Sequence, residues 1–145
     1  MDKDRLHIIL CDDDEDDREF FGLVARQWAP HVMVTTVESA ESLLKTLGTS
    51  DTVDLVFLDL NMPVVSGREC LKLIRENKAL DRVAVIIYST AADDRDVEAT
   101  FRNGANLYVQ KPASTAGLTS ILDKIAAMDK AELMVRQRRK FVLDY

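Results

Sequence analysis

The residues of this chain that can do chemistry follow short apolar runs, at the point where each run ends. They are Asp12-Asp13-Asp14 after residues 7–11, Asp59 after residues 53–58, and Lys111-Pro112 after residues 106–109. A carboxylate can attack a phosphoryl group only when their shared negative charge is neutralised, and Mg²⁺ or Mn²⁺ with oxygen ligands does this. Acids packed together without a cation would raise one another's pKa, which favours a metal here. The combination predicts a metal-assisted phosphoryl acceptor, with Lys111 as a point charge for the acceptor carboxylate and then for a phosphoryl oxygen.

Each of these groups also has an ordinary structural interpretation. An acidic run such as residues 12–17 usually marks a solvated helix start, where the helix dipole favours negative charge. Taken alone, Asp59 is a strand terminator, Lys111 a surface base and Ser89-Thr90 a helix N-cap. Their joint placement after the first, third, fourth and fifth runs favours the functional interpretation, because chance would have to produce all four.

Short runs of aliphatic and β-branched residues alternate with segments of helical periodicity. The runs cover residues 7–11, 32–37, 53–58, 83–88 and 106–109. One helical stripe covers residues 40–47, with Ser39 as the expected N-cap and Gly48 at the expected stop. This alternation predicts an α/β domain with a parallel sheet covered by helices on both faces. Because ligands bind at the carboxyl ends of such strands, the polar groups are expected to converge there.

The composition is that of a globular chain of 145 residues, long enough for one domain without disulfides. A formal net charge of −6 argues against nucleic-acid binding, although five bases face only three acids from residue 129 to 145. The two cysteines, Cys11 and Cys70, indicate neither a disulfide framework nor a zinc site. A charged N-terminus and the lack of a long apolar stretch predict no signal peptide, no membrane partner and a cytoplasmic location.

As a set, these motifs resemble a response-regulator receiver domain of the chemotaxis-Y type, over about residues 6–128. The resemblance implies a flavodoxin-like fold: a doubly wound, five-stranded parallel sheet in the order 2-1-3-4-5, with five helices and a C-terminal helical extension. It also implies a role for each site residue: Asp59 as phosphoacceptor; Asp12, Asp13, Asp59 and the main-chain carbonyl of Asn61 as metal ligands; and Ser89, Thr90, Tyr108 and Lys111 as phosphate-contacting and switch residues. The bond between Lys111 and Pro112 is a candidate cis peptide, since cis bonds occur almost only before proline.

The resemblance further implies a signalling protein rather than an enzyme. Residues 1–128 would form the receiver domain, and residues 129–145 a basic and apolar extension without a separate output domain. The expected phosphodonor is a sensor histidine kinase or a histidine phosphotransfer protein, and phosphorylation is expected to switch protein–protein interactions. Asn61 and Ala91 occupy positions that tune dephosphorylation in the family, and we expect moderate-to-slow loss of phosphate.

The stretches 88–91 and 106–112 look closest to the stand-alone regulators that pair with bacterial phytochrome-type kinases. In keeping with those regulators, a homodimer through the last strand, the last helix and the extension is expected. The extension is expected to be a solvated helix with apolar residues that pack on a neighbour: Leu133, Met134, Phe141, Val142 and Leu143.

Other functional classes fit less well. A hydrolase of the haloacid-dehalogenase type needs an Asp-x-Asp motif at its nucleophile, whereas Asp59 is followed by Leu60-Asn61. A calcium loop beginning at Asp12 would need a glycine at its sixth position and a glutamate at its twelfth, and it has neither. The alternative that stays open is a receiver-like binding module that works without phosphorylation.

Overall fold

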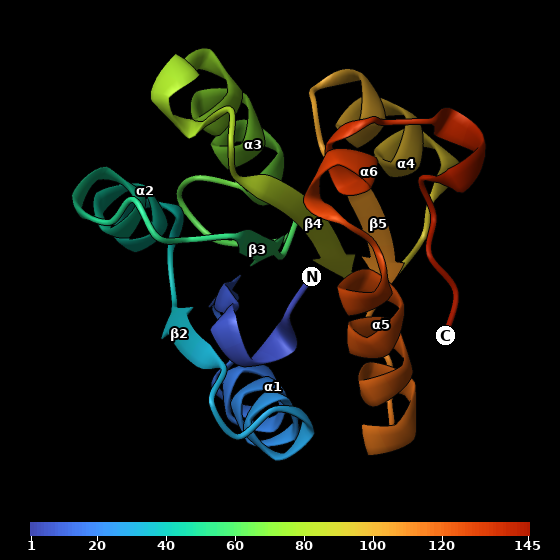
Figure 1. Ribbon diagram of the computed structural model, residues 1–145. Coiled ribbons are helices and arrows are strands. Elements are labelled where there is room, and N and C mark those ends of the chain that lie inside the picture. The colour runs from blue at the N-terminus through green and yellow to red at the C-terminus, as the bar shows by residue number, and fades with distance from the viewer.

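A computed structural model describes residues 1–145 as one five-stranded sheet flanked by helices (Figure 1). The strands are β1 (His7–Cys11), β2 (Met33–Val37), β3 (Leu55–Leu58), β4 (Ala84–Ser89) and β5 (Leu107–Gln110). The helices are α1 (Glu15–Trp28), α2 (Ala40–Thr49), α3 (Gly67–Glu76), α4 (Asp94–Arg102), α5 (Thr115–Ala127) and α6 (Lys130–Met134). Every strand pair is parallel and the order is β2-β1-β3-β4-β5, so the predicted doubly wound sheet is confirmed.

The sheet separates two apolar cores, because successive side chains of a strand point to opposite faces. In β3, Phe57 faces the core formed with α1 and α5, whereas Val56 and Leu58 face the core formed with α2, α3 and α4. Strands β1, β3 and β4 are buried on both faces, which explains their near-continuous apolar sequences. β2 is an edge strand whose residues are exposed or half-buried. The cores fix the three central strands rigidly and thereby the polar residues that follow them.

Short polar side chains begin the six α-helices. Ser39 caps α2 as predicted, accepting a hydrogen bond from the main-chain N–H of Ser42. Gly48 does not end that helix, which continues to Thr49, so the predicted stop is one residue early. At α1 the cap is Asp14, and at α3 it is Ser66. The cap of α1 directly follows Asp12-Asp13, and the cap of α3 ends the loop that follows Asp59.

Gly67 allows α3 to begin directly against the end of β3. Its N–H donates to the carbonyl of Leu60 (2.9 Å), and a Cβ at this position would lie 2.0 Å from the carbonyl oxygen of Asp59. Only glycine permits such a close approach of two backbones. The loop between them contains Val64, which is fully exposed and has a φ of 66°.

The C-terminal extension, residues 129–145, is helical only in its first turns. After α6 and a single 3₁₀ turn at Arg138–Lys140, it runs beside β5, where Val142 forms a parallel bridge with Tyr108. The N–H of Tyr108 donates to the carbonyl of Phe141 (2.9 Å), and its carbonyl accepts from the N–H of Leu143 (2.9 Å). Figure 1 shows this segment beside β5 and α5.

The expectation that the apolar residues of the extension pack on a neighbour is wrong for Leu133 and Phe141. Both are buried within their own chain, and Phe141 packs edge-on against Phe101 and Tyr108. The free edge of β5 accounts for this, since it offers unpaired N–H and C=O groups to any extended segment that can reach it.

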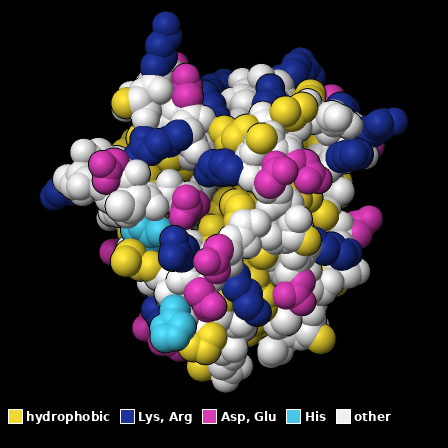
Figure 2. All heavy atoms as spheres, in the orientation of Figure 1, with side chains coloured by type: hydrophobic (Ala, Val, Ile, Leu, Met, Phe, Trp, Pro, Cys, Tyr) yellow, Lys and Arg dark blue, Asp and Glu magenta, His cyan; other side chains and the backbone are white.

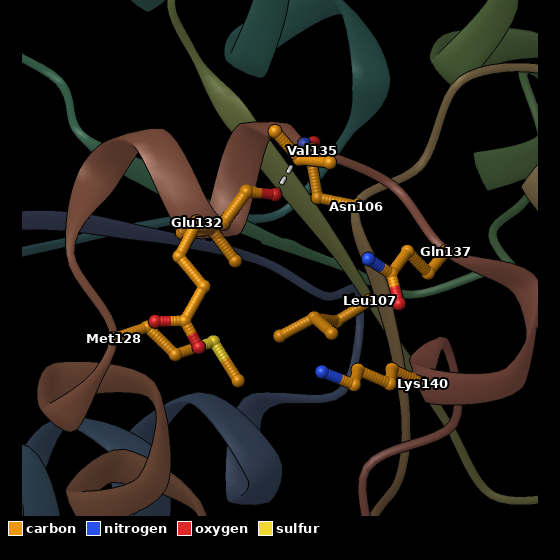
Figure 3. A pocket seen from close by; sticks show the side chains of 8 residues that line it. Asn106, Leu107, Met128, Glu132, Val135, Gln137 and Lys140 are labelled. Carbon is orange, nitrogen blue, oxygen red and sulfur yellow. Dashed lines mark hydrogen bonds between the residues drawn. The ribbon is translucent and has the colours of Figure 1, made fainter.

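Helix α6 closes a small cavity of about 190 Å³ against the start of β5 (Figure 3). Asn106 ties the cavity wall to the sheet: its amide donates to the carbonyl of Leu133 (3.2 Å), and its oxygen accepts from the N–H of Val85 (2.8 Å). Arg75 of α3 donates to the same oxygen (2.9 Å). The buried Asn106 therefore joins α3, β4 and the extension.

All peptide bonds are trans, including the one between Lys111 and Pro112, so the candidate cis bond is wrong. The trans form is the more stable for X–Pro by about 0.5–1 kcal/mol. The N–H of Lys111 continues the pairing of β5 by donating to the carbonyl of Ser89 (2.7 Å). No helix of the structure has the length and apolar character needed to cross a membrane.

Candidate functional site

The carboxyl ends of β1, β3, β4 and β5 meet at one open hollow of about 580 Å³, as the strand pattern predicts. We call it the acidic hollow. Its lining contains no hydrophobic residue and consists of Asp13, Asp14, Glu15, Asp16, Asp17, Asp59, Asn61, Thr90 and Lys111. Asp12 lies directly beneath and is fully buried. The predicted acids and the lysine are therefore brought together.

Asp12, Asp13 and Asp59 form a cluster whose ligand oxygens all lie within 4.8 Å of one another. One oxygen of Asp12, Oδ1, accepts from the N–H of Asp14 (3.0 Å). The other, Oδ2, has no hydrogen bond, and the ammonium of Lys111 lies 2.7 Å from it in a contact that lacks hydrogen-bond geometry. A buried carboxylate oxygen without a hydrogen bond suits a hard cation with oxygen ligands, so these three residues fit Mg²⁺ or Mn²⁺.

Burial raises the pKa of the Asp59 carboxyl to about 6. The N–H of Asn61, which donates to Asp59 Oδ1 (3.2 Å), and the charge of Lys111 act in the opposite direction, while Asp12 and Asp13 add to the rise. Metal-free Asp59 is thus poised between its charged and neutral forms just below neutral pH. A cation at the cluster would favour the ionised form, which is the nucleophilic one.

Lys111 reaches into the hollow from the end of β5 and is mostly buried. Its Nζ lies 2.7 Å from Asp12, 2.8 Å from Asp17 and 3.8 Å from Asp59. Burial alone would lower the pKa of this ammonium, but the pairs with Asp12 and Asp17 outweigh burial and raise it. Lys111 is therefore a permanent positive charge beside the Asp59 carboxylate.

The contact between Lys111 and Asp17 was missed by the sequence analysis. In the acidic run 12–17, the sequence assigns a role in the site to the pair at its start and none to Asp17. Asp17 occupies the third position of α1, and the first turn of that helix lies over the strand ends. The available signal was the helical register of the run, which places Asp17 three residues after its cap, Asp14.

Ser89 and Thr90 differ in where their side chains lie. Thr90 lines the hollow, whereas Ser89 is buried beside Tyr108. Burial raises the pKa of the Tyr108 phenol and the Ser89 hydroxyl opposes the rise. The hydroxyl of Tyr108 donates to the carbonyl of Ala91 (2.7 Å), so Tyr108 links β5 to the loop that follows β4.

Comparison with known proteins agrees with this geometry. Residues 8–123 match the family described as the response regulator receiver domain. Two-component response regulator ORR11 of Oryza sativa subsp. indica is 25% identical over 119 residues, which make up 82% of this chain and 80% of that protein.

Two solved structures are similar over most of their length. The phosphorylated cyanobacterial phytochrome response regulator RcpA is 26% identical, with a TM-score of 0.74 over 83% of this chain and 91% of RcpA. A response regulator receiver domain from Rhodospirillum rubrum is 25% identical, with a TM-score of 0.76 over 86% of this chain and 96% of that domain. With a family match over most of its length, the sheet order of this fold and an acidic cluster at the strand ends, the chain belongs to the response regulator receiver family.

Proposed function

We propose that this chain is a phosphorylation-operated switch in which Asp59 accepts a phosphoryl group. The observation that carries the proposal is the position of Asp59, which directly follows β3 inside the acidic cluster, with the ammonium of Lys111 3.8 Å away. Other aspartates of the hollow are less suited, because Asp12 is fully buried beneath it and Asp13 is exposed. Among these three, only Asp59 both lines the hollow and is buried beside the ammonium of Lys111.

Receiver domains of response regulators are phosphorylated by histidine kinases or phosphotransfer proteins and generally act as phosphoacceptors rather than as enzymes. We infer that the donor here is a phosphohistidine of such a protein. An oxygen of Asp59 would form a bond to phosphorus as the bond between phosphorus and the histidine nitrogen breaks, leaving the imidazole on the donor. RcpA, solved in its phosphorylated form, supports the same chemistry here.

Asp12, Asp13, Asp59 and the main-chain carbonyl of Asn61 would hold Mg²⁺, with Mn²⁺ as the alternative. When bound, the metal neutralises the charge that would otherwise repel a phosphoryl group from the carboxylates. Lys111 contributes a second positive charge, which first faces the Asp59 carboxylate and then a phosphoryl oxygen. The Thr90 hydroxyl lines the hollow and would donate to the phosphoryl group.

The output of the switch is proposed to be a change of surface along β4 and β5. Ser89 or Thr90 would move toward the phosphoryl group, and Tyr108 would follow because its hydroxyl holds the loop after β4 at Ala91. Tyr108 also pairs with the C-terminal extension through both of its main-chain groups. Phosphorylation would then shift the population of protein–protein contacts that involve this edge.

We further propose that residues 1–128 are the receiver unit and residues 129–145 an extension without output activity of its own. A homodimer through β5, α5 and the extension stays a proposal, with Val135, Val142 and Tyr145 as the large apolar side chains that the extension exposes. Charges of both signs are interspersed over the face seen in Figure 2, which favours a protein partner over a nucleic acid. Asn61 at the acceptor and the apolar Ala91 support moderate-to-slow loss of phosphate.

Intact-mass analysis after incubation with acetyl phosphate, with and without Mg²⁺, tests the proposed function. Wild type and the matched control Asp51→Ala, an exposed aspartate outside the hollow, are expected to gain one phosphoryl group only with Mg²⁺. Asp59→Ala is expected to gain none. A folded wild-type protein that stays unmodified would instead favour a binding module that works without phosphorylation.

A further inference from the structure

We propose that Asp17 is a positioning residue that keeps the Lys111 ammonium beside Asp59 when a metal takes over Asp12. This inference rests on the proposed function, since it concerns how the phosphoacceptor site is assembled. Asp17 is outside the metal cluster, which contains only Asp12, Asp13 and Asp59. Its role is therefore exerted through Lys111 and not through direct contact with the reacting atoms.

The local structure of α1 leaves the Asp17 carboxylate free for Lys111. Asp17 is the third residue of the helix, a position from which an acidic side chain often turns back to the N–H of the cap residue. Here the N–H of the cap, Asp14, already donates to Asp12 Oδ1 (3.0 Å). The Asp17 carboxylate accepts a hydrogen bond from Lys111 Nζ instead (2.8 Å).

The ammonium of Lys111 and a metal ion would compete for the same oxygen of Asp12. Asp12 Oδ2 is buried, has no hydrogen bond and lies 2.7 Å from Lys111 Nζ. Oδ1 already accepts the N–H of Asp14, so Oδ2 is the more open of the two Asp12 oxygens to a cation at the cluster. A cation bound to Oδ2 would repel the ammonium, so metal binding is expected to move Lys111 away from Asp12.

Asp17 is the carboxylate that still holds Lys111 after this displacement. An ammonium carries three N–H donors, and the pair with Asp17 uses one of them. The remaining donors can face Asp59, now 3.8 Å away, and a phosphoryl oxygen placed between them. Without Asp17, Lys111 would have only Asp12 and Asp59 as acidic partners and would compete with the metal more strongly.

The test is a calorimetric titration of Mg²⁺ into the unphosphorylated protein, which reads metal binding without any reaction. Asp17→Asn is expected to raise the half-saturating Mg²⁺ concentration by about threefold or more relative to Asp16→Asn, a factor in the range of a partly exposed ion pair. Asp16→Asn is the matched control. It removes the same charge from the lining of the hollow, but Asp16 makes no ion pair. Equal shifts in the two variants would overturn the proposal.

A double-mutant cycle would test whether Asp17 affects metal binding through Lys111. In a Lys111→Ala background, whose fold is checked by circular dichroism, Asp17→Asn is expected to change Mg²⁺ affinity no more than Asp16→Asn does. A persisting excess effect of Asp17→Asn would mean direct contact with the metal and would contradict the positioning role. If acetyl phosphate phosphorylates wild type but Asp17→Asn and Asp16→Asn shift the Mg²⁺ affinity equally, only this inference fails. If acetyl phosphate leaves wild type unmodified, the proposed function itself fails.

Discussion

The acidic hollow and the C-terminal extension both rest on β5, yet opposite interactions hold them. The hollow gathers carboxylates above the buried Asp12, and burial raises the pKa of Asp59, so the folded state disfavours the ionised form of Asp59. The extension is held by apolar burial at Phe141 and by two main-chain hydrogen bonds to Tyr108. The hollow holds carboxylates whose mutual repulsion a bound cation can relieve, whereas the extension contributes ordinary packing energy.

Around β5, the residues needed for function are therefore different from the residues needed for stability. Lys111 at the end of β5 pairs with acids, while Tyr108 three residues earlier pairs with the extension. A change in the hollow is therefore expected to alter metal binding and phosphorylation, often with a gain in stability. A change in the extension is expected to lower stability first.

The largest effect is expected for Phe141→Ala. Truncating a fully buried aromatic side chain that packs on Phe101 and Tyr108 should lower the free energy of unfolding by about 3 kcal/mol. Urea denaturation would measure the loss. Val142→Ala, which truncates a 37% exposed neighbour, is the control and should cost much less. Equal losses in both variants would mean that the extension is not packed on β5 in solution.

Asp59→Asn is expected to stabilise the metal-free protein at neutral pH. Because the folded-state pKa of about 6 lies above the usual value of 3.8, the stability that this carboxyl contributes is fully present below the usual pKa. That contribution is lost as the pH rises through the folded-state pKa. The amide cannot ionise, so the variant should be more stable than wild type by about 1–3 kcal/mol at about pH 7, with the difference vanishing near about pH 4.

Thermal unfolding in Mg²⁺-free buffers across this pH range would measure the difference. Asp51→Asn, an exposed aspartate outside the hollow, is the control and should follow wild type. A gain in stability that is constant with pH would contradict the assignment of the difference to Asp59 ionisation.

Mg²⁺ is expected to offset part or all of the stability that Asp59 ionisation costs the metal-free protein. At a concentration ten times its dissociation constant, a ligand that binds only the folded state adds about 1.4 kcal/mol to stability. Wild type should show this rise in melting temperature, and Asp12→Asn should lose most of it because a cluster ligand is missing. If Asp12→Asn responds to Mg²⁺ as wild type does, the cation binds elsewhere.

The smallest effect is expected for Arg138→Ala in the extension. Arg138 pairs with Glu98 at 2.6 Å, but both side chains are more than 40% exposed, at 43% and 46%. Exposed ion pairs contribute about 0.2–1 kcal/mol, so the loss should fall in that range and shrink in high salt. Denaturation at two salt concentrations would measure it. A loss as large as that of Phe141→Ala would mean that charge, rather than packing, holds the extension.

The parallel sheet, the site residues that converge and the cap of α2 could be predicted because each has a local or periodic signature, whereas the strand order came only from the family resemblance. Asp59 and Lys111 follow apolar runs, and parallel topology brings such strand ends together. The path of the extension had no such signature. The pairing of Phe141 with Tyr108 joins segments 33 residues apart through main-chain groups, which are the same in every sequence. Asp17 was missed because its partner, Lys111, comes from the far end of the chain.

The bridge between Val142 and Tyr108 also bears on the solubility of the protein. A parallel sheet has two lateral edges, and an uncovered edge is a template on which further chains can add and aggregate. The extension covers the β5 edge at Tyr108, which leaves the exposed and half-buried β2 as the other edge. Shortening the chain before Phe141 would uncover a second edge, with buried aromatic side chains beside it. The last five residues are therefore expected to reduce edge-to-edge self-association at β5.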